Sequence, residues 1–135
     1  MKEILHPYPC VVDELKWKLT VAHGDYPENR KAVECNAIWD TGASNTTVDV
    51  RLAKALGLKR LNLPPRVSNT GNGKILSYAY EAHLKLSPEW PLQKVVVYDM
   101  PPSDMPVLIG MDIISRGIFQ TWPQEGRTML RFVMP

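Results

Sequence analysis

Apolar and polar residues alternate over several short stretches of this chain. In the segment 11–22 the apolar positions are Leu15, Trp17, Leu19 and Val21, separated by lysine and threonine. This period of two predicts a strand with one buried face. Turn-forming residues at 23–29 precede a second apolar segment at 31–39. The two segments together predict a hairpin whose second strand ends at Asp40.

A longer alternation follows a glycine-containing turn. The turn consists of Asn69, Thr70, Gly71, Asn72 and Gly73. Every second residue from Leu76 to Leu86 is apolar or aromatic, which predicts a hairpin with a long second arm over 66–86. The segment 92–98 contains three consecutive valines, Val95, Val96 and Val97, a pattern typical of a strand buried on both faces.

Helical patterns are few and short. Asp49 is placed to cap a helix, and Gly57 stands where a left-handed C-cap falls. Apolar residues on one face of this helix are Leu52, Ala53 and Leu56. Asp112 is interpreted as a residue at the start of another short helix, and a last hairpin is expected from 118–122 and 127–133. The chain is therefore expected to be mainly β.

Length and composition limit the possible functions. A chain of 135 residues suits one domain, which we assign to residues 11–135 after an extended N-terminal arm at 1–10. The net charge of +2 does not indicate a nucleic-acid or membrane partner. No apolar run reaches membrane-spanning length, and the N-terminus lacks the pattern of a secretory signal. We therefore expect a cytoplasmic protein with Cys10 and Cys35 as free thiols.

The candidate chemistry lies at Asp40, which begins an Asp-Thr-Gly tripeptide. Alone, such an acid is most simply a solvated turn former, and the tripeptide occurs by chance in roughly one or two in a hundred chains of this length. Its neighbours give it more weight, because a helix and a hairpin follow, and then an apolar run that ends in glycine. That run, about seventy residues after Asp40, includes Leu108, Ile109 and Gly110. A glycine there permits a close approach of two backbones.

This order of motifs resembles the retropepsin-like aspartic peptidases over roughly residues 30–120. The resemblance implies a small closed β-barrel-like aspartic protease fold with one or two short helices. It implies a homodimer in which Asp40 of each copy is catalytic, since one chain holds a single Asp-Thr-Gly. It also implies that Thr41 braces the two turns across the twofold axis, that Gly42 offers its amide to a carboxylate oxygen, and that Ala43 lines the cleft floor.

The same resemblance assigns the residues around this turn. Leu108, Ile109 and Gly110 would be the structural signature that passes behind the catalytic turn. The turn at 69–73 would be the tip of a flap that closes over a peptide or protein substrate. Apolar residues would flank the bond that is cut.

Two carboxylates that share a proton can activate a water molecule, one acting as general base and the other as general acid. This chemistry requires neither cofactor nor metal, and the histidines show no spacing that suggests a metal site. The leading hypothesis is an aspartic endopeptidase. A non-catalytic peptide-binding or dimerisation module of the same fold is the alternative, and an unrelated small barrel with an accidental triplet is a third possibility.

Overall fold

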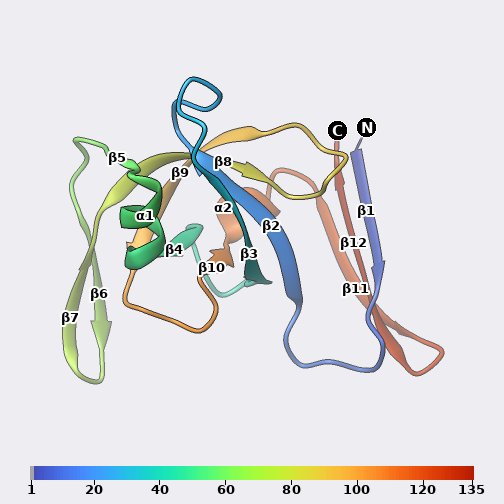
Figure 1. The fold of residues 1–135 in the computed structure, drawn as a ribbon. Helices are drawn as coiled ribbons and strands as arrows, with labels where there is room; N and C mark the ends of the chain where they lie inside the picture. Colours follow the sequence, from blue (N-terminus) through green and yellow to red (C-terminus); the bar gives the residue numbers. More distant parts are fainter. Residues whose placement is uncertain (1) are drawn as a thin grey trace.

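The computed structural model describes residues 2–135, apart from the side chain of Thr70, and within this part six strands close into a barrel (Figure 1). In hydrogen-bonded order they are β2 (Lys16–His23), β3 (Ala32–Trp39), β10 (Val107–Ile109), β4 (Thr47–Asp49), β9 (Gln93–Met100) and β8 (Ala79–Lys85). Strand β8 pairs back onto β2, which closes the ring, and the short β5 (Lys59–Arg60) extends the sheet beyond β8. The expected mainly β, closed-barrel fold is confirmed.

Alternating side chains fill the interior of the barrel. The inward positions include Val21, Val48, Leu84, Val97 and Ile109, which are all almost completely buried. Several outward positions, such as Lys18 and Val96, remain exposed to solvent, and the expectation that 92–98 is buried on both faces is wrong. Val96 is 41% exposed, because it pairs with Glu81 on the outer surface of the barrel.

Two short helices join the strands. Helix α1 (Val50–Leu56) begins at Asp49, whose side chain accepts a hydrogen bond from the backbone N–H of Arg51. It ends at Gly57, which has φ +61° and ψ +36°, as predicted for a left-handed C-cap. Helix α2 (Met111–Ile114) follows β10 directly. Neither helix is long enough, within the described residues, to cross a membrane.

A separate sheet contains both ends of the described chain (Figure 1). Its strands are β1 (Lys2–Pro7), β12 (Arg127–Met134) and β11 (Ile118–Gln124), in that order and all antiparallel. The segment expected as an N-terminal arm therefore includes a paired strand. Ile4 and Phe132 face the barrel and join its core, where the rings of Phe132 and Trp39 lie 5.1 Å apart.

Strands β6 (Arg66–Thr70) and β7 (Gly73–Ser77) form a two-stranded hairpin that projects from the barrel (Figure 1). The alternation over 66–86 predicts one long second arm, but the structure divides this arm at Tyr78. The buried carboxylate of Asp99 accepts hydrogen bonds from the backbone N–H of Tyr78 and from the hydroxyl of Tyr80. This anchor fixes the chain where the hairpin ends and β8 begins.

Candidate active site

Asp40 follows β3 directly and lies in a turn that holds its carboxylate. The backbone N–H of Asp40 donates to Ile109 O at 2.8 Å, which ties the turn to the end of β10. The N–H of Gly42 donates to Asp40 Oδ1 at 2.9 Å. A Cβ on residue 42 would lie 3.2 Å from that same oxygen, so glycine leaves the carboxylate room. The carboxylate is therefore positioned by its own turn, half-buried at the edge of the barrel.

Gly110 lies behind this turn, against its backbone. An added Cβ would lie 2.5 Å from the carbonyl carbon of Asn45 and 2.9 Å from Ala43 O. Immediately after Gly110, the N–H of Met111 donates to Ala43 O at 2.8 Å and the N–H of Asp112 donates to Ser44 O at 3.2 Å. The close approach predicted at this glycine is thus present, and it lets the start of α2 support the Asp40 turn.

A polar link between Thr46 and Asp112 also supports the turn. Asp112 Oδ1 accepts from the Thr46 hydroxyl at 2.8 Å and from the Thr46 backbone N–H at 3.0 Å. The Thr46 hydroxyl oxygen in turn accepts from the N–H of Gly110 at 3.1 Å. Asp112 lies in the first turn of α2, in agreement with its expected place at a helix start, but the sequence analysis did not identify Thr46. The only sequence signal was position, because Thr46 lies shortly after the Asp-Thr-Gly tripeptide and Asp112 lies shortly after Gly110.

Asp40 lines a cavity of about 390 Å³. Thr41 and Leu108 line this cavity, as do Asp13, Glu14 and Leu15 from the loop before β2. Sequence reasoning missed these three residues, because they reach Asp40 only through the pairing of β2 with β3. Among the described residues, no three His, Cys, Asp or Glu side chains are grouped so as to hold a metal ion.

The β6–β7 hairpin lies next to the Asp40 turn through its base. A second cavity, of about 220 Å³, is lined from the turn by Ala43, Ser44 and Asn45 and from the hairpin by Arg66, Ser68 and Ser77. The predicted tip residues Asn69, Gly71, Asn72 and Gly73 are exposed and line neither cavity. The backbone of Thr70 ends β6, and its side chain lies outside the described part.

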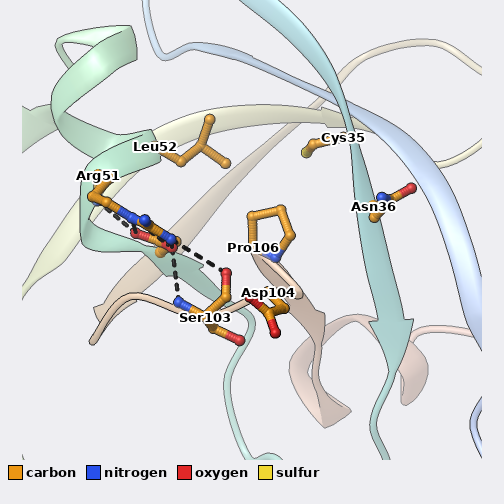
Figure 2. A pocket seen from close by; sticks show the side chains of 8 residues that line it. Cys35, Asn36, Arg51, Leu52, Ser103, Asp104 and Pro106 are labelled. Atoms are coloured by element: carbon orange, nitrogen blue, oxygen red, sulfur yellow. Dashed lines mark hydrogen bonds and ion pairs between the residues drawn. The ribbon is translucent and has the colours of Figure 1, made fainter.

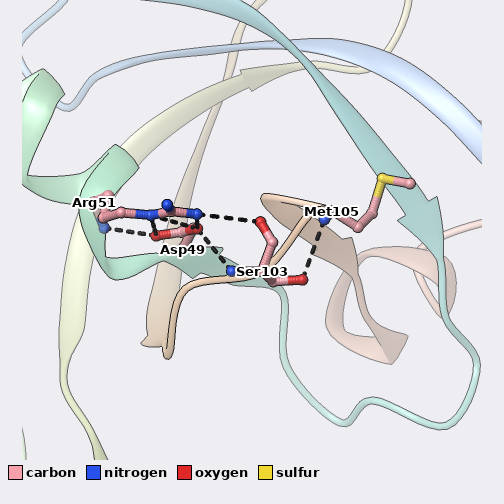
Figure 3. Close-up of polar contacts among 4 residues, drawn as sticks. All are labelled: Asp49, Arg51, Ser103 and Met105. Atoms are coloured by element: carbon pink, nitrogen blue, oxygen red, sulfur yellow. Dashed lines mark hydrogen bonds and ion pairs between the residues drawn. The ribbon is translucent and has the colours of Figure 1, made fainter.

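Another polar cavity, of about 480 Å³, lies at the opposite end of β10 from Asp40 (Figure 2). One of its lining residues is Asp49, whose buried carboxylate accepts from the guanidinium of Arg51 at 2.7 Å and from the N–H of Ser103 at 3.0 Å (Figure 3). The hydrogen bond from Arg51 holds the pKa of Asp49 well below its usual range. All these bonds serve to fasten the loop before β10 to α1.

Cys35, on the wall of the same cavity, is not an activated thiol. Burial, with a smaller effect of the Glu34 charge, raises the pKa of the Cys35 thiol to about 11. A thiol with such a pKa stays protonated at neutral pH and is a poor nucleophile. Cys10 and Cys35 are both free, as expected. Asp40 therefore remains the best candidate for chemistry among the described residues.

Comparison with known proteins agrees with this geometry. The sequence model of the aspartyl protease family matches residues 21–113, which include the Asp40 turn, the hairpin and β10. DNA damage-inducible protein 1 of Saccharomyces cerevisiae (strain ATCC 204508 / S288c) is 34% identical over 83 residues. That match covers 59% of this chain but 19% of the yeast protein, so the chain spans about a fifth of its relative.

Solved structures are similar in fold. A retropepsin-like aspartic protease from Rickettsia conorii superposes with a TM-score of 0.56 and 17% identity, over 97% of this chain and 94% of that one. The EIAV protease, in complex with the inhibitor HBY-793, superposes with a TM-score of 0.51 and 16% identity, over 80% and 90% of the two chains. With the family match over most of its barrel, this chain belongs to the aspartyl protease family and has a retropepsin-like fold.

Proposed function

We propose that the protein is an aspartic endopeptidase that is active as a homodimer. The observation that carries the proposal is the support of Asp40, whose carboxylate is held by the Gly42 amide and whose turn rests on Gly110. A half-buried carboxylate in a rigid turn, at the mouth of a cavity, suits a group that must hold a water molecule in place. The family match over 21–113 supports the same reaction class.

The proposed reaction needs a second carboxylate. Two aspartates close together cannot both ionise, so the pair holds one proton between them, as in other aspartic proteases. The ionised member takes a proton from water as the water attacks the peptide carbonyl, and the protonated member donates to the carbonyl oxygen. In this proposal Asp40 of a second copy supplies the partner, with Thr41 as the brace between the turns and Ala43 in the cleft floor.

The sheet of β1, β12 and β11 offers a surface for the second copy. Ile4 points toward the core, so its neighbours Glu3 and Leu5 on β1 face outward. Glu3 and Ile118 both pair with Val133 of β12, which is itself only 4% exposed. Leu5 is 55% exposed and Ile118 is 56% exposed. Exposed apolar side chains beside two unpaired strand edges favour association with another chain.

The β6–β7 hairpin would serve as the flap. Its base shares a cavity with the Asp40 turn, and its tip, at 69–73, projects away from the barrel. In the dimer we expect the tip to close over a peptide that lies along the Asp40 turn. Closure would exclude water other than the attacking molecule and strengthen the polar contacts of the site.

The first test is digestion of a diverse peptide mixture by the parent protein and by Asp40→Ala, from about pH 3 to pH 7, read by mass spectrometry. The expected result is cleavage by the parent alone. The molecular mass in solution is measured in parallel, to show whether the protein is a dimer. Full activity of a strict monomer would contradict the shared dyad. If neither the parent nor the variant cleaves any peptide at concentrations where a dimer is present, the result would contradict the peptidase proposal and favour a peptide-binding module.

A further inference from the structure

We propose that the cavity between the Asp40 turn and the base of the β6–β7 hairpin is a substrate subsite for a carboxylate side chain, glutamate or aspartate, with Arg66 as its counter-ion. This inference rests on the proposed function, because it assigns part of the peptide that the site would bind. It differs from the expectation that apolar residues flank the bond that is cut.

The lining of this cavity is polar and carries positive charge. Hydroxyl groups come from Ser44, Thr47, Ser68, Ser77 and Tyr98, and an amide comes from Asn45. Arg66 supplies the only charge among the lining residues, all of which lie in the described part, and Ala43 is the only apolar member. A cation surrounded by hydroxyl donors, without any carboxylate, is an environment that stabilises an anion.

Arg66 is held at the cavity and has no acidic partner. Its guanidinium carbon lies 5.6 Å from the centroid of the Tyr98 ring, so the base of the hairpin contacts strand β9 of the barrel. No carboxylate among residues 2–135 forms an ion pair with Arg66, a feature that it shares with Arg60 and Arg116. A guanidinium that is stacked but not neutralised keeps its donors for a ligand.

Several other polar groups of the lining are also without partners. Within the described residues, the hydroxyls of Ser68, Ser77 and Tyr98 make no hydrogen bond to protein. These hydroxyls can donate to a bound carboxylate without breaking a hydrogen bond of the protein. A peptide with an acidic side chain brings the carboxylate that Arg66 and the hydroxyls would bind.

The size of the cavity selects a side chain as its occupant. Its volume of about 220 Å³ is smaller than the roughly 300–1,000 Å³ typical of small-molecule sites. It lies directly beside Ala43, three residues after the proposed catalytic aspartate. A peptide that extends from Asp40 along the turn therefore passes the mouth of this cavity, and the bound side chain belongs to a residue close to the scissile bond.

The test uses quenched fluorescent peptides that carry a single glutamate at successive positions around one cleavage site, each matched with a glutamine and a lysine analogue. At one position we expect kcat/KM at about pH 6 to be roughly three- to tenfold higher for glutamate than for glutamine, as a partly screened ion pair allows. The preference should disappear near pH 3, where the substrate carboxyl is protonated. Arg66→Glu should reverse it in favour of lysine.

Lys74→Glu is the matched control, because it changes charge by the same amount on the same hairpin and does not line the cavity. It should leave the glutamate preference intact, and circular dichroism should show both variants folded. A parent enzyme that treats glutamate and glutamine alike at every position would overturn the subsite. So would a preference that survives Arg66→Glu.

Failure of the peptidase itself gives a different result. If no Asp40-dependent cleavage occurs, the same peptides are bound to Asp40→Asn and followed by fluorescence anisotropy. Tighter binding of the glutamate peptide that Arg66→Glu abolishes would support the anion subsite in a binding protein. Equal affinity for the glutamate and glutamine peptides would overturn the subsite together with the peptidase.

Discussion

Replacement of Gly110 by alanine tests whether the backbone behind Asp40 sets the position of the carboxylate. The added Cβ would lie 2.5 Å from the carbonyl carbon of Asn45, whereas ordinary contacts begin at 3.4 Å. The obstructing atoms are backbone, so a side-chain rotation cannot relieve the clash. In a close-packed interior the turn at 43–45 must therefore move by roughly 1 Å.

This displacement has two expected consequences of known size. Overpacking of this kind costs about 2 kcal/mol, which corresponds to roughly 8 °C in Tm for a domain of this length. The hydrogen bond from Met111 N–H to Ala43 O, 2.8 Å in the parent, should lengthen or break. Because a shift of about 1 Å at a catalytic group costs on the order of 100-fold in rate, kcat/KM should fall by about that factor.

Two measurements check the prediction. Thermal denaturation followed by circular dichroism gives the change in Tm, and peptide cleavage is measured far below the Tm of the variant. Gly71→Ala is the control for folding, because a Cβ at that exposed turn meets nothing within 4 Å. A Gly110→Ala protein with the parent Tm and parent activity would refute the reasoning. The Tm comparison stands even if the protein proves to be no peptidase.

Other substitutions test separate parts of the fold. Thr46→Val removes the hydroxyl that donates to Asp112, and urea denaturation should show a loss of about 2 kcal/mol because a partly buried carboxylate loses a donor. Because Arg51 lowers the pKa of Asp49 in the folded state, Asp49 stabilises the fold above about pH 4 and this contribution is lost as the pH falls further. Asp49→Asn should therefore be less stable than the parent at pH 7 in urea titrations. The difference in the free energy of unfolding should narrow toward pH 3, and a difference that stays constant with pH would contradict this reasoning. Leu84→Ala, at a residue 1% exposed, should cost about 3 kcal/mol in the same assay, and a loss below about 1 kcal/mol would contradict its place in the core.

Local patterns were enough to predict most of the elements. The alternation before Asp40 predicts the β2–β3 hairpin, and Asp49 and Gly57 mark the two ends of α1, because strand periodicity and helix caps depend on residues close in sequence. Val96 shows the limit of this reasoning. An apolar run predicts burial, but the exposure of each side chain in the run depends on whether another layer covers that side of the barrel.

The support of the site was harder to predict because it joins distant residues. Thr46 and Asp112 are 66 positions apart, and their contact exists only once β4 and β10 are paired. Asp13 reaches the Asp40 cavity through the β2–β3 pairing. The break at Tyr78 depends on Asp99, a residue of the neighbouring strand that no local pattern connects to it. Motif spacing thus located the candidate carboxylate, Asp40, while the contacts that hold it required the fold.

The isolation of the β6–β7 hairpin has a consequence for protein motion. The ladder from Arg66↔Ser77 to Thr70↔Gly73 is a sheet of its own and, within residues 2–135, shares no strand pairing with the barrel. Opening of this hairpin therefore breaks few hydrogen bonds and leaves the barrel ladders intact. Native-state hydrogen exchange should divide the amides into two groups, with the hairpin exchanging through local opening and the barrel strands only through global unfolding. Substitutions that stabilise the barrel should slow exchange in the second group and leave the hairpin rates unchanged.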